Sequence, residues 1–256
     1  HATARYMITH TGAADEQLGR WRRQRAAWDR AVDLMPVPGE RITIPYEGVE
    51  LAGYFFRAPD AAEGERRPLV VMINGSDGTT SAMWLQGGAA AAERGYHWMT
   101  FDGPGQQSTL FELGIPFRPD WEAVLTPVVD AMVARADVDA ARIGIIGISQ
   151  AGYWVPRALA FEHRFAAAVV DPGVTDVSES WTTPLPKVMR DQLAEGKQKV
   201  FDREMSAVGA LSHSTRAVLR FRGEPYKVPG DSVYDLYQEV GRYRLGDEVS
   251  QITTPL

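Results

Sequence analysis

The sequence has 256 residues, which suffices for one large α/β domain with an insertion. The net charge of −6 argues against a nucleic-acid partner, and the absence of cysteine excludes disulfides, thiolate nucleophiles and cysteine-ligated metals. No apolar run is long enough to span a membrane. We therefore expect a cytoplasmic protein without a metal or organic cofactor.

The two ends of the sequence suggest a piece of a longer chain. It begins at His1 rather than methionine and shows no signal peptide. It stops at Thr254-Pro255-Leu256, where residues 251–256 read as the start of a further core strand. We expect the chain to be truncated at both ends.

Residues 1–38 are predicted to form an N-terminal helical segment. An apolar stripe recurs at helical spacing over residues 13–35. The stripe consists of Leu18, Trp21, Trp28, Val32 and Met35. The neighbouring basic side chains are expected to form a solvated face of the docked helix, since most lie off the stripe. They are Arg20, Arg22, Arg23, Arg25 and Arg30.

Residues 39–173 alternate between strand and helix patterns and are predicted to be an α/β core. Residues 41–46 and 49–57 alternate apolar with polar side chains and predict an antiparallel hairpin. Apolar strands are expected at 69–73, 97–101, 142–148 and 166–170, and helices at 81–94, 121–134 and 150–162. Such alternation predicts a mostly parallel sheet with helices on both faces.

Residues 174–250 show no convincing strand and are predicted to form a helical lid inserted between two sheet strands. Helices are expected over 187–205, 206–220 and 232–243. A lid of this kind excludes water from a site and shapes its pocket.

The most informative stretch is residues 142–154. Ile143 to Ile148 form an apolar strand, a turn follows at Ser149, and a helix begins directly after it. Gly147 and Gly152 bracket the serine, and Ala151 is small, as close approach of strand and helix requires. This is the pattern of a nucleophile elbow, in which Ser149 is the nucleophile of an α/β-hydrolase fold. A plain strand-to-helix turn with a serine cap is the simpler alternative.

An oxyanion hole is predicted from two backbone amides. One is the N–H of Gln150, which follows the nucleophile. The other comes from the loop after the 69–73 strand, where Gly75 and Ser76 are the candidates and Asp77 is their neighbour. A glycine-rich turn without function would show the same residues.

The base of a catalytic triad is missing from the sequence. In this fold the chain order is serine, then aspartate or glutamate, then histidine. We expect both the acid and the histidine beyond residue 256. His213, in the predicted lid, is a poor substitute because it does not fit that order.

Three motifs together resemble one subgroup of the α/β-hydrolases. They are Asn-Gly-Ser-Asp at 74–77, Phe-Asp-Gly-Pro-Gly-Gln at 101–106 and Gly-Ile-Ser-Gln-Ala-Gly-Tyr at 147–153. The subgroup includes 2,6-dihydroxypseudooxynicotine hydrolase, fungal polyketide-shortening hydrolases and the fermentation–respiration switch protein. The resemblance covers residues 41–173 and implies a helical N-terminal segment and a lid over the active site.

The resemblance also implies a lid-side carboxylate after the nucleophile, and Glu179 is the residue that matches it. An exposed glutamate without a role is the alternative. Trp154 and Trp181 are candidate pocket-lining residues, although buried aromatics belong by default to a core. Asp102 is expected to fix its own loop.

These observations predict a serine hydrolase in which Ser149 attacks the carbonyl of a small molecule. The scissile bond would be ester-like or the C–C bond of a ketone or β-diketone. The protein would be a monomer or a homodimer. The alternative is a non-catalytic binding or regulatory protein that retains the fold.

Overall fold

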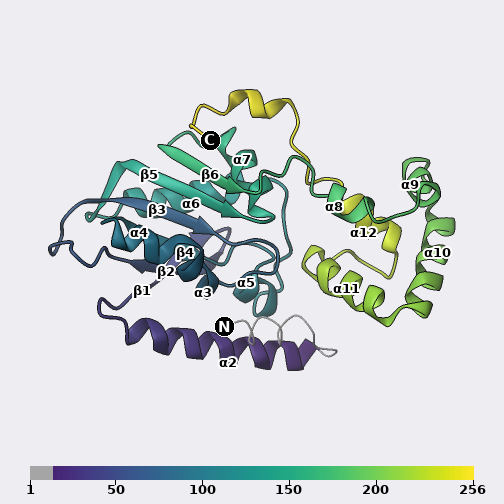
Figure 1. Ribbon diagram of the computed structural model, residues 1–256, viewed down its shortest axis with the longest axis horizontal. Coiled ribbons are helices and arrows are strands. Elements are labelled where there is room, and N and C mark those ends of the chain that lie inside the picture. Colours follow the sequence, from purple (N-terminus) through teal and green to yellow (C-terminus); the bar gives the residue numbers. More distant parts are fainter. Residues whose placement is uncertain (1–13) are drawn as a thin grey trace.

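The computed structural model describes residues 14–256, and the statements below concern that part of the chain (Figure 1). A six-stranded sheet has the order β1-β2-β4-β3-β5-β6. Its strands are β1 (Glu40–Tyr46), β2 (Val49–Phe56), β3 (Arg67–Ile73), β4 (His97–Phe101), β5 (Val138–Ile148) and β6 (Ala167–Asp171). β1 and β2 form the predicted antiparallel hairpin, and β4, β3, β5 and β6 run parallel to one another. The predicted mostly parallel sheet is therefore confirmed.

Strands β3 and β4, in the middle of the sheet, are buried on both faces over most of their length, which explains why they are largely apolar. Strand β6, at the edge, exposes Ala167, Val169 and Asp171. In β3, Leu69, Val71 and Ile73 join one core cluster, while Met72 joins the other. The same alternation in β5 sends Ile145 to the first cluster. The sheet thus separates two hydrophobic cores.

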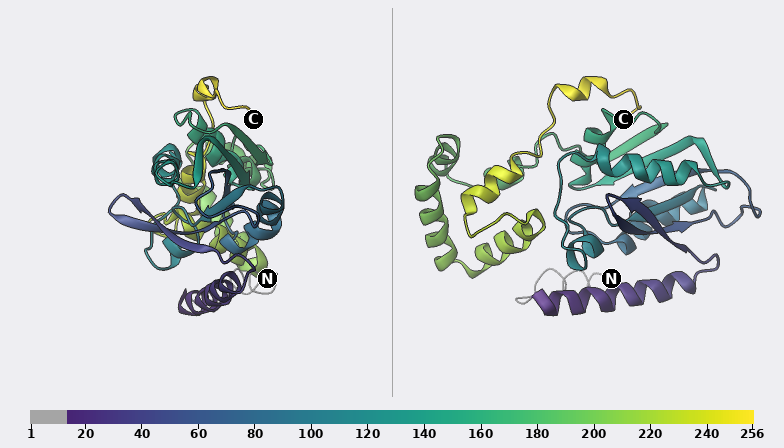
Figure 2. Two further views of the ribbon diagram at one scale, coloured as in Figure 1. Left: turned by 90° about the vertical axis from the view of Figure 1, so that its left-hand side faces the viewer. Right: turned by 180° about the vertical axis from the view of Figure 1, so that it is seen from behind.

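Helices cover both faces (Figures 1 and 2). α6 (Glu122–Val133) and α7 (Ala151–Leu159) pack into the first core, and α2 (Ala14–Asp33), α3 (Thr80–Met83) and α4 (Ala89–Glu93) pack into the second. The single helix predicted over 81–94 is wrong in its middle, because a π-helical stretch, Trp84–Gly88, separates α3 from α4. Gly87 has φ 144°, which an α-helix cannot accommodate.

Helix α2 confirms the predicted N-terminal helix from Ala14 onward; residue 13 lies outside the described part. Trp21, Trp28 and Val32 are buried as predicted. Arg25 corrects the idea of a wholly solvated basic face, because its Nη1 donates to Asp102 Oδ2 at 2.9 Å. The Asp102 side chain is fully buried, and that of Arg25 is 17% exposed. A charge pair between the helix and the sheet thus helps to dock α2.

Residues 174–250 contain helices and no strand of the sheet. They are α8 (Glu179–Thr182), α9 (Lys187–Ala194), α10 (Gln198–Leu211), α11 (His213–Gly223), η2 (Glu224–Tyr226), α12 (Val233–Val240) and η3 (Asp247–Gln251). The predicted helix boundary at 205/206 is wrong, since α10 runs across it and the breaks fall after α9, near Gly196, and at Ser212. That glycine has φ 73°, a left-handed conformation that ends α9.

This helical group lies beside the sheet and is joined to it by two extended segments (Figure 1). The segments are paired, because Val177 N donates to Tyr243 O at 3.0 Å and Leu245 N donates to Thr175 O at 2.8 Å. Side chains of the group, among them Trp181 and Tyr226, belong to the same core cluster as Trp154 beneath the elbow. This helical group and the α/β core therefore share one hydrophobic interior.

The strand predicted at 251–256 is not formed. η3 extends to Gln251, and the residues after it have no regular structure. They do run beside β6, where Ala168 N donates to Pro255 O at 2.8 Å. In the described part of the chain, no helix has the length and apolar character of a membrane span.

Candidate active site

The sheet topology places two loops at one point. From β3 the chain crosses to β4 on one side, whereas β5 lies on the other side of β3. In parallel sheets, ligands bind at the carboxyl ends of the strands where the order reverses in this way. Ile73 pairs with Gly147 in the register of β3 and β5, so the loop after Ile73 emerges beside the turn at Ser149.

The backbone at Ser149 has the strain that the elbow prediction requires. Its φ is 60°, in the left-handed region that non-glycine residues seldom adopt. Ser149 N donates to Asp171 O at the end of β6, 2.7 Å away, and this bond fixes the turn. The serine residue is exposed rather than buried in the core. The structure thus presents the hydroxyl at the carboxyl edge of the sheet.

The small residues around the elbow are needed for space. A Cβ on Gly147 would lie 2.7 Å from Ala151 O, and one on Gly152 would lie 1.9 Å from Pro172 O. A Cβ atom does not approach other heavy atoms this closely in folded proteins. Only glycine therefore fits at these two positions without a shift of the backbone, as the motif predicts.

Gly75 lies in the loop after β3 and brings that loop against Ser149. A Cβ at this position would lie 2.6 Å from Ser149 Cβ and 2.9 Å from Ser149 Oγ. The glycine therefore allows a backbone approach that a side chain would block. Ser76 is the next residue of this loop.

Both candidate oxyanion donors are available. Within residues 14–256, the backbone N–H groups of Ser76 and Gln150 donate to no carbonyl or side chain. Gln150 begins α7 as its N-cap, where backbone N–H groups have no partner inside the helix. The positive end of the helix dipole favours negative charge at this position. The two amides suit the oxygen that becomes an anion when a nucleophile attacks a carbonyl.

The described histidines lie elsewhere. His97 begins β4, at the opposite edge of the sheet from the elbow, and its Nδ1 accepts the Ala58 N–H at 2.9 Å. Burial lowers the pKa of His97, and the nearby arginines act in the same direction although Asp137 opposes them. His163 Nδ1 lies 3.4 Å from Thr253 Oγ1, and His213 is exposed at the start of α11. None of these three is placed as a base for Ser149.

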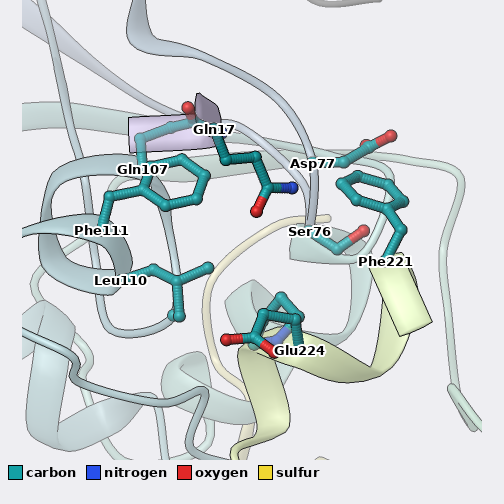
Figure 3. A pocket seen from close by; sticks show the side chains of 10 residues that line it. Gln17, Ser76, Asp77, Gln107, Leu110, Phe111, Phe221 and Glu224 are labelled. Carbon is teal, nitrogen blue, oxygen red and sulfur yellow. The ribbon is translucent and has the colours of Figure 1, made fainter. Parts of the chain in front are cut away.

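A shallow, open hollow lies beside the Ser76 loop (Figure 3). Its wall comes from α2, from the 76–77 loop, from α5 (Gln107–Phe111) and from the end of α11 with η2. Phe111 and Phe221 stand on opposite sides of it in the view of Figure 3. Ser76 and Asp77 line it, whereas Ser149 does not. The hollow therefore meets the site through a candidate oxyanion donor.

Gln107 gives this hollow an unused polar group. The residue is 5% exposed, and its Oε1 is buried without a hydrogen-bond partner among the described residues. A buried amide oxygen without a partner is unfavourable and is usually explained by a function or a bound group. Sequence reasoning missed this residue because α5 is too short to show a periodic pattern.

The two tryptophans predicted to line the pocket are core residues. Trp154 is fully buried and stacks on Trp121, with ring centroids 4.5 Å apart. Trp181 is 4% exposed and meets the Tyr226 ring edge-on at 5.9 Å. Neither lines the hollow. Both belong to the core cluster that also contains residues of α7 and of the helical group at 174–250.

The helical group at 174–250 contacts the elbow through Tyr226. Its hydroxyl lies 3.4 Å from Gln150 Nε2, which donates to it. Burial raises the pKa of Tyr226, and the bond from Gln150 offsets only part of that rise. The tyrosine therefore stays neutral and accepts this hydrogen bond at neutral pH.

Glu179 lies apart from these groups. It is the first residue of α8, and its side chain is exposed. It does not line the hollow. The lid-side carboxylate that the resemblance implies stays a prediction.

Comparison with known proteins finds hydrolases among the relatives of this chain. The prolyl oligopeptidase family (Peptidase_S9) matches residues 124–226, which include the elbow. The α/β hydrolase ucsC of an Acremonium species is 34% identical over 186 residues, which are 66% of this chain and 38% of that protein. The hydrolase acrC of Aspergillus aculeatus is 35% identical over 177 residues, which are 63% of this chain and 41% of that protein. The chain thus spans about two-fifths of the length of these curated relatives.

A solved structure extends the comparison to nearly the whole chain. The crystal structure of 2,6-dihydroxy-pseudo-oxynicotine hydrolase superposes with a TM-score of 0.76 at 21% identity. The match covers 99% of this chain and 61% of that one. Agreement at this identity establishes the fold, and the fungal relatives supply the sequence link. The chain has the α/β-hydrolase fold, and its sequence is similar to fungal hydrolases of the subgroup that its three motifs resemble.

Proposed function

We propose that this chain carries the nucleophile and the oxyanion hole of a serine hydrolase. The observation that supports it most is that two loops meet where the strand order of the sheet reverses, at the carboxyl ends of β3 and β5. Ser149 is exposed at φ 60°, and Gly75 holds the neighbouring loop against it. The backbone N–H groups of Ser76 and Gln150, one on each of these two loops, have no acceptor among residues 14–256. A turn that only ends a strand would need none of this strain or close approach.

The reaction follows from this arrangement. Ser149 Oγ forms a bond to the carbonyl carbon of the substrate while a base removes its proton. The carbonyl oxygen gains the negative charge, and the Ser76 and Gln150 amides donate to it. Collapse of the intermediate breaks the bond to the leaving group, which takes up the proton. Water then hydrolyses the acyl–serine ester in a second attack.

We further propose that the base and its carboxylate follow Leu256 in the complete protein. The fold sets the order serine, acid, histidine, and the histidines of the described part lie away from Ser149. The substrate would be a carbonyl compound with an ester-like bond or a C–C bond next to the carbonyl. Its apolar part would occupy the hollow between Phe111 and Phe221.

The test uses the full-length protein and p-nitrophenyl butyrate as a probe ester. Ser149→Ala should lower kcat at least about 10⁴-fold, because the covalent route is lost. Ser206→Ala, at an exposed serine of α10, is the matched control and should retain wild-type rates. Rates for Ser149→Ala equal to those of the wild type would refute the proposal. They would favour a binding or regulatory protein with the same fold.

A further inference from the structure

We propose that Gln106 is a positioning residue that aims the second oxyanion donor, an inference that rests on the proposed function. Gln106 follows β4 and is 1% exposed. Its Nε2 donates to Asn74 O at 2.7 Å and to Gly75 O at 3.0 Å, and Asn74 Oδ1 is a third acceptor at 3.0 Å. One side-chain amide therefore holds two successive peptide groups of the loop that approaches Ser149.

Because the peptide group is planar, the contact to the Gly75 carbonyl also fixes the direction of the Ser76 N–H. Gly75 O and the Ser76 N–H belong to the same planar trans peptide group, in which the C=O and the N–H point in opposite directions. Gln106 fixes the carbonyl on one side of that plane. The Ser76 N–H must then point to the other side, away from Gln106. This N–H has no acceptor in the described part of the chain.

The Gln106 side chain is also fixed by the hydrogen bond that its amide oxygen accepts. Gln106 Oε1 accepts the Gly103 N–H at 2.8 Å, so both polar atoms of the side chain are engaged. The backbone carbonyl of Gln106 accepts the Thr109 hydroxyl. The amide therefore cannot rotate without breaking several buried hydrogen bonds, each worth about 0.5–1.5 kcal/mol. Donors that are fixed before the reaction stabilise a developing charge best.

A purely structural role is the competing explanation, because buried amides are generally satisfied wherever they occur. The two explanations differ in what a substitution changes. A structural residue affects folding stability and leaves the balance between ground-state and transition-state binding unaltered. A positioning residue changes kcat and the affinity for a tetrahedral adduct, and spares the affinity for a planar ketone.

Two variants of the full-length protein separate these cases. Gln106→Met has a similar length but no hydrogen bonds. Gln106→Glu keeps an acceptor for Gly103 and places an oxygen against the two carbonyls. The matched control is Ser108→Ala, which removes a 2.8 Å hydrogen bond to Asp102 in the same loop without touching residues 74–76. The assays are kcat and KM for p-nitrophenyl butyrate, inhibition by an alkyl trifluoromethyl ketone and by the matching methyl ketone, and Tm.

We expect Gln106→Met to lower kcat about 10- to 100-fold, less than the loss of a whole donor, with KM within about threefold. Inhibition by the trifluoromethyl ketone, which forms an oxyanion on Ser149, should weaken by a similar factor. Inhibition by the methyl ketone should not change. Gln106→Glu should lose more activity than Gln106→Met because its oxygen repels both carbonyls, and it decides the matter if Gln106→Met does not fold.

The failures of the two proposals are distinguishable. A wild-type protein without Ser149-dependent hydrolysis refutes the proposed function and this inference with it. An active wild type whose Gln106 variants lose no more kcat than Ser108→Ala overturns the positioning role alone. Equal losses in affinity for the two ketones also overturn it, because the effect would then not be specific to the oxyanion.

Discussion

Replacing Gly75 with alanine tests the close approach that defines the site. The new Cβ would lie 2.6 Å from Ser149 Cβ and 3.0 Å from Ile148 O. Carbon atoms in contact prefer about 3.5–4.0 Å, so the loop and the elbow must separate by roughly 1 Å. A displacement of about 1 Å at a reacting centre can cost about 10²-fold in rate. Overpacking should also lower the free energy of unfolding by about 1–3 kcal/mol.

The assay is the second-order rate of labelling by a fluorophosphonate, with thermal unfolding measured in parallel. Gly173→Ala is the matched control, because a Cβ there meets only Val170 Cγ2 at an ordinary 3.8 Å. We expect Gly75→Ala to react about 100-fold more slowly than Gly173→Ala at a temperature where both are folded. Labelling of the two variants at rates within threefold of each other would show that the loop does not depend on glycine, and would refute the reasoning.

Three further predictions concern docking, the lid and the hollow. Arg25→Met should lower the free energy of unfolding by about 3 kcal/mol, because it leaves the buried Asp102 charge without its partner; Arg23→Met, at an exposed neighbour, should change it by less than about 0.5 kcal/mol in the same denaturant titration. Burial raises the pKa of Asp176, but hydrogen bonds from Ser178 and Arg244 outweigh this effect and hold that pKa below its usual value. The ionised carboxylate therefore stabilises the folded state fully above about pH 4, and this stabilisation is lost as the pH falls through the folded-state pKa. Arg244→Met should therefore flatten the fall in Tm between pH 5 and pH 3, and an unchanged slope would contradict this origin. Gln107→Leu should leave the free energy of unfolding unchanged or raise it by up to about 1 kcal/mol, since it removes an unsatisfied buried oxygen, yet it should raise KM for a substrate that fills the hollow; a loss of stability with an unchanged KM would count against the hollow as a binding site.

The elbow could be predicted from the sequence because its signal is local. An apolar strand, small residues and a helix start lie within thirteen positions around Ser149. The loop at Gly75 could be predicted for the same reason, since it directly follows a buried strand. The parallel order of the strands then brings both to one edge.

Features that depend on distant residues could not be predicted in the same way. Arg25 looked like a solvated arginine because its partner, Asp102, is 77 residues away in sequence. One signal was nevertheless present, because Arg25 lies four residues after Trp21 and three before Trp28, on the buried stripe. The break at Gly196 was also visible as a glycine after a helical pattern. The hollow gave no signal, since four separate segments create it.

Mapping the site of a fluorophosphonate adduct tests the central claim most directly. The full-length protein would be labelled, digested with trypsin and analysed by tandem mass spectrometry. The adduct should lie on Ser149, within the tryptic peptide that runs from Ile143 to Arg157, and should be absent from Ser149→Ala. An adduct on another serine, or wild-type protein that remains unlabelled, would contradict the assignment of Ser149 as the nucleophile.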